Sequence, residues 1–434
     1  MSNRRKFIKQ LGSTIALTSA SLSSFAAKEE HERRILQAEK RTGPNDKVRF
    51  ATIGMGIMGF NDTRTALACP GTELAACCDL YTGRLDHAKE LFGNNIAVTK
   101  NYHDILDRKD IDAVIIATQD FDRVIPCIHA CQAGKDVYAE KPLTLYPGEG
   151  RALVRAARKY KTVFQVGTQQ RSMEMDQIAC KLVRTGGLGK IKLVECMNYP
   201  DSKPFTVLPE EPKPEKLDWE VWTGQAPMRP YNKQLHGGWG GYQDYGGGET
   251  TNWGAHGLDM VQMALGMDES GPVEFWPLTE PEGGVAFRYA NGVEVRLVLP
   301  YGKENEYLLG GARFTGEKGK IDIWRNNFKI DASGVALDLP PQEEIAKWHD
   351  QRALWQAQYH MGYWLECIPT RKRPNADVEI GHRSVSVCHL ANLARRLNRK
   401  LRWDPAKEHI IGDKEANLLA TNRPRRKGWE LPRL

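Results

Sequence analysis

The fold is decided by Val48-Arg49-Phe50-Ala51-Thr52-Ile53-Gly54-Met55-Gly56-Ile57-Met58-Gly59. The first six residues form a short, mainly apolar run that is typical of a buried strand, and a helical pattern follows over residues 63–69. The remaining six match G-x-G-x-x-G, whose glycines allow a tight turn and let a pyrophosphate approach the backbone at a helix N-terminus. The stretch therefore predicts a dinucleotide site at Gly54, Gly56, Ile57, Met58 and Gly59.

Asp79 adds the second part of this pattern. It ends the next predicted strand, residues 73–78, and follows Gly59 at the distance expected for an acidic residue that binds a ribose. Its carboxylate would repel a 2′-phosphate, so NAD is favoured over NADP. Arg84 leaves the alternative open, because its guanidinium would attract that phosphate if Asp79 turned away.

Strands and helices then alternate as far as residue 167. Such alternation implies right-handed βαβ units and an open parallel sheet, so we expect an α/β Rossmann domain over residues 47–167. The further strands are expected at 73–78, 113–117, 136–139 and 163–166, and the helices at 82–91, 123–133 and 149–159.

The second half of the chain shows a different pattern. Short apolar runs separated by glycine-containing breaks favour a large, mainly antiparallel open sheet in an α+β domain over residues 168–434. A segment rich in Pro, Gly and Trp, residues 204–245, is expected to be an ordered excursion. The strands are expected at 190–198, 283–289, 293–299, 312–315 and 320–324, and the helices at 175–184, 254–265, 356–367 and 382–397.

The N-terminus is typical of an export signal. Residues 1–26 carry four basic residues and no acidic one, and Asn3-Arg4-Arg5-Lys6-Phe7-Ile8-Lys9 is similar to the twin-arginine motif. The run that follows is too short and too polar to span a bilayer. We expect residues 1–26 to be a cleaved signal, 27–46 an exposed arm, and the protein to be periplasmic, without stable membrane insertion.

Charge and cysteine usage exclude other classes of protein. The formal charge of +7 is concentrated at the two ends, since residues 27–422 hold 52 basic and 53 acidic side chains. A nucleic-acid partner is therefore not expected. The 9 cysteines form no C-x-x-C pair and have no histidine at ligand spacing, which argues against a disulfide scaffold and a metal site. Buried thiols are expected at Cys127 and Cys131.

Two further motifs are candidates for chemistry. Glu140-Lys141-Pro142 follows a predicted strand of the parallel sheet, at the edge where such sheets bind ligands. It is equally consistent with an ordinary loop. The run from Gly246 to Asp259 passes from a glycine-rich loop into a helix and places Asn252 and His256 four residues apart. His256 is a reasonable general base at that position.

Taken in order, these motifs resemble the Gfo/Idh/MocA oxidoreductases, and the whole set resembles a secreted branch of that family. The resemblance implies that Lys141 lies beside the nicotinamide and that His256 exchanges the proton of the reacting hydroxyl. It further implies that Glu140 holds Lys141, and that Thr118 and Gln169 contact the cofactor. Asn252 stands where the family commonly has Asp, and Arg123 stands where it has a histidine.

The function expected from this resemblance is an NAD-dependent oxidoreductase that acts on a secondary hydroxyl of a sugar, glycoside or cyclitol. The candidate substrate ligands are Arg171, Tyr242, Asn252 and His256. Two alternatives stay open: a glycosidase or lyase that oxidises C3 transiently, whose relatives usually lack the Glu-Lys-Pro motif, and a non-catalytic sugar-binding or nucleotide-binding protein. The resemblance also implies a homo-oligomer, either a dimer or a tetramer.

Overall fold

The computed structural model describes residues 47–301, 307–335, 337, 339–348, 358–421 and 423–434. The predicted signal (1–26) and arm (27–46) lie outside the described residues. In the part of the chain that is described, every helix is too short or too polar to cross a membrane.

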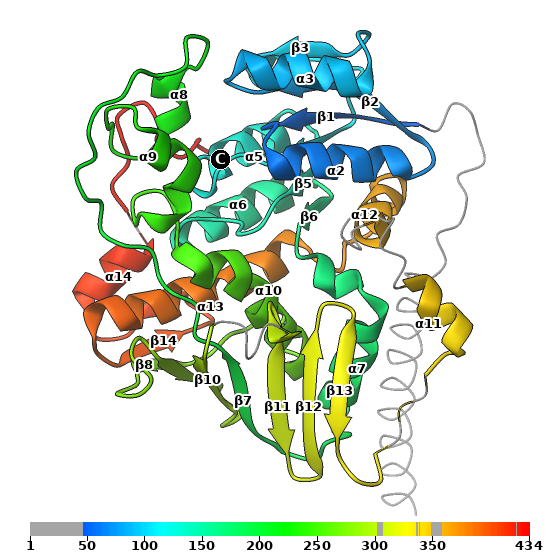
Figure 1. Cartoon of the computed structure of the whole chain (residues 1–434), viewed down its shortest axis with the longest axis vertical. Coiled ribbons are helices and arrows are strands. Elements are labelled where there is room, and N and C mark those ends of the chain that lie inside the picture. The colour runs from blue at the N-terminus through cyan, green and yellow to red at the C-terminus, as the bar shows by residue number, and fades with distance from the viewer. Residues whose placement is uncertain (1–46, 302–306, 336, 338, 349–357, 422) are drawn as a thin grey trace, which may run out of the picture. The chain divides into compact units, whose positions relative to one another are not determined.

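The first half of the described chain forms a six-stranded sheet in the order β3-β2-β1-β4-β5-β6 (Figure 1). All neighbouring strands are parallel. The chain runs outward from β1 to β3 and then returns to the other side of β1 as β4, so the order reverses between β1 and β4. Ligands of open α/β sheets bind at such a reversal. The strands are β1 (Val48–Ile53), β2 (Thr72–Cys78), β3 (Ala97–Thr99), β4 (Ala113–Ile116), β5 (Asp136–Ala139) and β6 (Phe164–Val166).

The helix after the glycine motif begins earlier than predicted. It starts at Ile57, directly after the turn, rather than at residue 63. Gly59 in its first turn weakens the helical signal of the sequence, because glycine is a poor helix former. The prediction also missed β3 and α4, which are three and four residues long. The helices of this half are α2 (Ile57–Ala68), α3 (Thr82–Phe92), α4 (His103–Leu106), α5 (Val124–Gln132) and α6 (Pro147–Lys159), with the short η1 (Asp120–Asp122).

The second half is built on a nine-stranded sheet in the order β13-β12-β11-β7-β10-β9-β8-β14-β15. Every neighbouring pair is antiparallel except β7 with β10. The predicted fold class is confirmed, although β8, β13, β14 and β15 were missed. The strands are β7 (Ile191–Met197), β8 (Glu274–Pro277), β9 (Val285–Arg288), β10 (Glu294–Leu299), β11 (Ala312–Gly316), β12 (Gly319–Trp324), β13 (Asn327–Asp331), β14 (Leu401–Asp404) and β15 (His409–Ile410).

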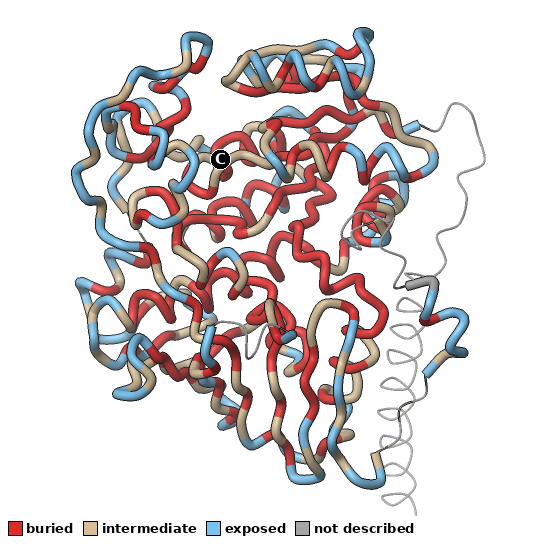
Figure 2. The backbone as a smooth tube through the Cα atoms, viewed as in Figure 1, coloured by how far each residue is buried: buried red, intermediate tan, exposed pale blue. Residues whose placement is uncertain are grey.

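Helices pack on one face of the large sheet and connect it with the first half of the chain. Buried side chains of α7, α10 and α13 form one core with those of the strands, which Figure 2 shows as a continuous buried interior. α13 also contacts α6, and α12 contacts α2. α10 begins at Gly248, six residues before the predicted start. The bounds are η2 (Gln169–Ser172), α7 (Glu174–Arg184), α10 (Gly248–Leu265), α11 (Gln342–Trp348), α12 (Gln358–Thr370), α13 (Val378–Leu397) and α14 (Lys414–Thr421).

The Trp-rich excursion is ordered, as the sequence predicts. It contains α8 (Trp219–Thr223), α9 (Lys233–Gly238) and η3 (Trp239–Gly241), which lie beside the first sheet and its helices in Figure 1. Its aromatic side chains form a separate core with Phe121 of the first half. The excursion belongs in sequence to the second half of the chain but covers the first.

Candidate active site

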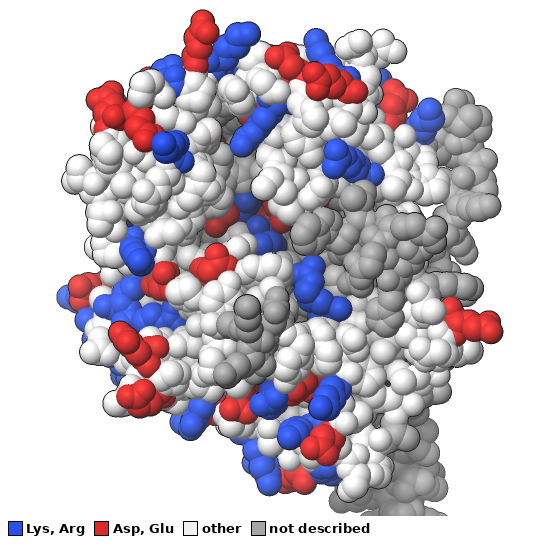
Figure 3. All heavy atoms as spheres, in the orientation of Figure 1, with Lys and Arg blue, Asp and Glu red and all other residues white. Residues whose placement is uncertain are grey.

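One cavity of about 1230 Å³ extends along the carboxyl ends of the parallel strands. Its wall combines the glycine turn, the end of β2, the Thr118–Arg123 segment, the Glu140–Pro142 motif, the start of α10 and the excursion. The space-filling view shows a hollow near the middle of the molecule's face, where acidic and basic side chains lie together (Figure 3). The cavity therefore joins the predicted dinucleotide site to the Lys141 motif.

The glycine turn can accept no side chain at two of its positions. Gly54 has φ +91°, and a Cβ there would lie 2.8 Å from the backbone of Ala117 and Thr118. Gly59 lies on α2, and a Cβ there would lie 1.9 Å from the carbonyl oxygen of Gly54. Gly54 thus permits the turn, and Gly59 permits close packing of the helix on the strand.

The N-terminus of α2 is open to the cavity. Its N-cap residue, Gly56, provides no side-chain cap, and a Cβ at Gly56 would meet nothing within 4 Å. The first N–H groups of a helix need an acceptor and attract anions. Ile57 lines the cavity with a residue exposure of 84%, and Met58 lines it as well. These features fit the pyrophosphate of a bound NAD.

Asp79 is fixed at the end of β2 with its carboxylate at the cavity wall. Its Oδ2 accepts a hydrogen bond from the N–H of Met55 (2.8 Å), and its Oδ1 accepts one from the N–H of Tyr81 (2.9 Å). Arg84 approaches Oδ2 at 3.4 Å. The carboxylate of Asp79 therefore points toward the glycine turn, and Arg84 is paired with it. Both features favour NAD over NADP.

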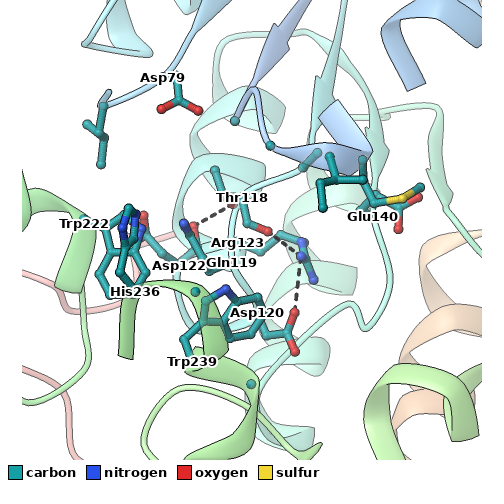
Figure 4. Close-up of a pocket in the computed structure, with 18 of the residues that line it drawn as sticks. Asp79, Thr118, Gln119, Asp120, Asp122, Arg123, Glu140, Trp222, His236 and Trp239 are labelled. Atoms are coloured by element: carbon teal, nitrogen blue, oxygen red, sulfur yellow. Dashed lines mark hydrogen bonds and ion pairs between the residues drawn. The ribbon is translucent and has the colours of Figure 1, made fainter. Parts of the chain in front are cut away.

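The segment after β4 is tied to the Lys141 motif by Arg123. The buried guanidinium of Arg123 donates hydrogen bonds to the carbonyl oxygens of Thr118 and Pro142 and lies 3.4 Å from Asp120. Figure 4 shows Arg123 between Thr118 and Asp120. Arg123 therefore braces two loops of the cavity wall, and this role explains a cation at a position where the resemblance leads one to expect a histidine.

Lys141 reaches from the parallel sheet to α10. Its Nζ donates hydrogen bonds to Oδ1 of Asn252 (2.8 Å) and to the carbonyl oxygen of Asn252 (3.3 Å). The amide Nδ2 of Asn252 donates to Oε2 of Glu249 (3.1 Å). All three residues line the cavity. Burial lowers the pKa of Lys141, while Glu140 and Asp120 act in the opposite direction.

Glu140 is buried behind Lys141. Its Oε2 accepts a hydrogen bond from the N–H of Lys141 (3.1 Å), and Gln169 approaches its Oε1 at 3.4 Å. Burial raises the pKa of Glu140, and Lys141 and Arg123 oppose the shift. Buried Asp62 on α2 interacts with the same carboxylate. Glu140 holds the Lys141 loop, as the resemblance implies, whereas Gln169 does not line the cavity and supports Glu140 instead.

His256 lies one helical turn beyond Asn252. It is 5% exposed, its ring is 6.0 Å from that of Trp253, and its Nδ1 has no hydrogen-bond partner among the described residues. Burial lowers its pKa well below the usual range, and the charge of Lys141 lowers it further. The imidazole is therefore neutral at pH 7 and able to accept a proton, although His256 is not one of the residues that line the cavity.

Two predicted substrate ligands have other partners in the structure. The guanidinium of Arg171 is buried against Asp259 and Asp268. The hydroxyl of Tyr242 accepts a hydrogen bond from Gln234 (3.0 Å), and its ring packs against Phe205. Neither residue lines the cavity. Of the four predicted substrate ligands, which include His256, Asn252 alone lines it.

The structure adds four aromatic residues that the sequence interpretation did not select as site residues. Trp222, His236 and Trp239 of the excursion lie beside the Gln119–Asp122 segment in Figure 4, and Trp429 of the C-terminal tail lines the same cavity. The run His236-Gly-Gly-Trp-Gly-Gly was the available signal, because glycine allows a ligand to approach the backbone closely, here beside two aromatic rings. These residues form the wall that faces the parallel sheet.

Hydrogen bonds fasten the excursion at both of its sides. The N–H of Asp218 donates to the carbonyl oxygen of Leu80 (3.4 Å), and Lys100 donates to that of Lys216 (2.7 Å). On the other side, the tail residue Arg426 donates to the carbonyl oxygen of Glu220 (2.8 Å). The excursion thus closes the cavity beside Asp79. Among the described residues, no group of three or more His, Cys, Asp or Glu is arranged to hold a metal ion.

Known proteins with similar sequences include inositol dehydrogenases and a glycosyl hydrolase. The chain is 26% identical over 172 residues to inositol 2-dehydrogenase from Salmonella paratyphi B. The matched segment covers 39% of this chain and 50% of that protein. It is 28% identical over 218 residues to a glycosyl hydrolase family 109 protein from Shewanella baltica, 44% of each chain. The chain thus spans about half the length of these curated relatives.

Solved structures show the same fold. The WlbA dehydrogenase from Bordetella pertussis, solved in complex with NADH and UDP-GlcNAcA, matches with a TM-score of 0.62 at 19% identity, over 84% of this chain and 99% of that one.

Two family descriptions together cover most of the chain. "Oxidoreductase family, NAD-binding Rossmann fold" matches residues 48–168, and "Oxidoreductase family, C-terminal alpha/beta domain" matches residues 202–431. The second match alone includes more than half of the sequence. The chain belongs to the Gfo/Idh/MocA oxidoreductase family.

Proposed function

We propose that this protein transfers a hydride between a secondary hydroxyl of a sugar, glycoside or cyclitol and a bound NAD. The observation that carries the proposal is that one continuous cavity joins the glycine turn and Asp79 to Lys141. A dinucleotide bound at the turn and a small polyol bound at Lys141 would lie side by side in this one cavity. Their reacting atoms would therefore be adjacent. The inositol 2-dehydrogenase relative supports a polyhydroxylated substrate.

When bound, NAD supplies the hydride acceptor or donor. The side chains supply the proton chemistry and the positioning. The ammonium of Lys141 stabilises negative charge that develops on the reacting oxygen. We assign the exchange of the hydroxyl proton to His256, because its Nδ1 has no partner among the described residues and its lowered pKa keeps the imidazole uncharged, although the same shift makes it a weak base. Buried Glu140 keeps the Lys141 loop in place.

The wall formed by the excursion favours a cofactor that stays bound. Trp222 and His236 lie at the cavity near Asp79, and hydrogen bonds hold the excursion to Leu80 and to the C-terminal tail. An enzyme that retains its NAD must reoxidise it on the protein, by reducing a second carbonyl compound. The motif at Asn3–Lys9 supports export by the twin-arginine route, and export of the folded holoenzyme would fit this requirement.

The decisive experiment is to purify the full chain without added nucleotide and to record absorbance at 340 nm while sugars, inositols and glycosides are offered. Reduction of bound nucleotide by one compound class is the expected result. Lys141→Met and His256→Gln should each lower turnover by about 10²-fold or more, whereas Lys192→Met, at an exposed position of β7, should not. Near-native turnover in both site variants would refute the assignment. Nucleotide that binds and is never reduced would instead indicate a non-catalytic binding protein.

A glycosidase is the second candidate, because a glycosyl hydrolase family 109 protein is among the relatives. In that reaction, oxidation at C3 acidifies the C2 proton, the aglycone is eliminated, water adds, and the C3 carbonyl is reduced again. The intact Glu140-Lys141-Pro142 motif favours the oxidoreductase. Release of an aglycone without net formation of NADH would favour the glycosidase.

We also propose that the protein forms a homo-oligomer through the open face of the nine-stranded sheet. The outward-facing side chains there alternate in charge; Arg288, Glu294 and Arg296 form a chain of ion pairs. Light scattering on the purified protein gives the mass in solution, and a monomeric mass at micromolar concentration would contradict this proposal.

A further inference from the structure

Three polar residues share the inner face of the first turns of α10. Glu249, Asn252 and His256 are spaced by three and four residues, so their side chains lie one above another on the helix. Glu249 and Asn252 line the cavity together with Lys141. Asn252 occupies the position where the family resemblance leads one to expect a carboxylate. The nearest carboxylate on this helix face is that of Glu249, one turn earlier.

The hydrogen bonds fix the orientation of the Asn252 amide. An ammonium donates only and an ionised carboxylate accepts only. Oδ1 of Asn252 accepts from Nζ of Lys141 at 2.8 Å, and Nδ2 donates to Oε2 of Glu249 at 3.1 Å. With the amide flipped, both contacts would be lost, since two donors would face each other on one side and two acceptors on the other. Glu249 and Lys141 thus hold the amide from opposite sides.

The charges around Lys141 come from several elements. The sheet side contributes carboxylates and a guanidinium, and α10 contributes one carboxylate and the neutral imidazole of His256. Of the charged groups on α10 that act on Lys141, Glu249 alone is negative, because Asn252 carries no charge. The groups that face Lys141 are Glu140, Asp120, Arg123, Asp62, Glu249 and His256.

We propose that Glu249 is a positioning residue that acts on Lys141 through the amide of Asn252. It keeps Oδ1 of Asn252 directed at the lysine and supplies, from one turn away, the negative charge that an aspartate at position 252 would supply directly. Glu249 lies in the first turn of α10, where the partial positive charge of a helix N-terminus favours a carboxylate. The consequence for catalysis rests on the proposed oxidoreductase function, whereas the arrangement of charges does not.

The test exchanges the carboxylate of residue 249 and the amide of residue 252. Glu249→Gln keeps an acceptor for Nδ2 of Asn252 but removes the charge. The double variant Glu249→Gln/Asn252→Asp restores a carboxylate next to Lys141, and the new glutamine amide then donates to it. Glu215→Gln, an exposed substitution in the excursion, is the matched control. The proposal requires that the double variant resemble the wild type more closely than the single variant does.

The first readout needs neither nucleotide nor substrate. Competitive acetylation of the full chain at a series of pH values, followed by mass spectrometry of the Lys141 peptide, gives the titration midpoint of that lysine. We expect Glu249→Gln to lower the midpoint by about 0.5–1 pH unit, as one charge at short range would, and the double variant to reverse the shift. A midpoint unchanged in Glu249→Gln, or not reversed in the double variant, overturns the proposal.

The second readout is turnover with a compound that reduces the bound nucleotide of the wild type. We expect kcat to fall about tenfold in Glu249→Gln, as for loss of one charged hydrogen-bond partner, with unchanged NADH affinity by fluorescence titration, and to recover in the double variant. If no compound is oxidised by the wild type, the proposed function fails and the lysine titration still decides this inference. If the wild type turns over and the double variant shows no recovery, the inference fails alone.

Discussion

Arg171 provides the sharpest test of how the second half of the chain is held together. Its side chain is 2% exposed, and its Nε lies 2.9 and 2.8 Å from the two carboxylate oxygens of Asp259, which is 1% exposed. Its Nη1 lies 3.0 Å from Asp268. In Arg171→Met, a side chain of similar length fills the space but leaves the carboxylate of Asp259 without its cation.

The cost of this change follows from the burial of the pair. Removing one partner of a buried ion pair typically destabilises a protein by about 3–5 kcal/mol, because the other charge stays desolvated. Asp259 would keep the hydroxyl of Ser384 at 2.5 Å as a donor. Burial raises the pKa of Asp259, and Arg171 opposes that shift. In Arg171→Met, the pKa of Asp259 in the folded state rises further above its value in the unfolded chain. The variant therefore loses stability as the pH rises through the folded-state pKa of Asp259.

Urea unfolding followed by tryptophan fluorescence gives the free energy of unfolding at pH 5 and pH 8. We expect Arg171→Met to be less stable than the wild type at both values and to lose more at pH 8. Arg64→Met, on the exposed side of α2, should be close to the wild type. A variant within about 0.5 kcal/mol of the wild type, with a raised KM for the substrate, would refute this reasoning and restore Arg171 as a substrate ligand.

Three further predictions concern the cofactor and pH. Asp79→Asn should weaken NAD binding by about 10-fold or more, since a charged acceptor is lost, and should strengthen NADP binding; calorimetry measures both, and unchanged NADP affinity would contradict the repulsion argument. Trp429→Ala should speed NADH release in stopped-flow fluorescence, whereas Lys427→Ala in the same exposed tail should not. Burial raises the pKa of Asp176 to about 8, so its contribution to stability is present at low pH and is lost between pH 4 and 8. Asp176→Asn should therefore flatten the pH dependence of unfolding, and an equally steep dependence would be evidence against this buried acid.

The parallel sheet was predictable because its information is local. Each strand from β1 to β6, apart from three-residue β3, is an apolar run bounded by turns, and the glycine motif fixes the first connection. The constraint at Gly54 comes from the backbone that follows the neighbouring strand, and the constraint at Gly59 comes from the carbonyl oxygen of Gly54, five residues earlier. Asp79 was equally predictable, since its position at the end of β2 follows from the number of residues that separate it from the glycine motif.

The substrate end was less predictable because its contacts join distant segments. Arg171 has a residue type suited to a sugar ligand, but its partner Asp259 lies 88 residues away in the sequence. Tyr242 was also predicted as a substrate ligand, yet its hydroxyl accepts a hydrogen bond from Gln234 and its ring packs against Phe205. In contrast, Trp239 and His236 reach the cavity because the excursion folds over another part of the chain. The sequence gives the residue types but does not show whether a side chain faces the cavity or another part of the protein.

The basic C-terminal tail is a second case, because the sequence gives its charge but not the partners of its arginines. The sequence shows only that positive charge is concentrated at this end of the chain. In the structure Arg423 pairs with Asp244 (3.1 Å), Arg425 pairs with buried Glu149, and Arg426 donates to the carbonyl oxygen of Glu220. These arginines are thus used to fasten the excursion and α6, which leaves little of the charge for an external polyanion. The tail therefore supports the cofactor wall that Trp429 completes, and its charge argues for a closed site rather than for a nucleic-acid partner.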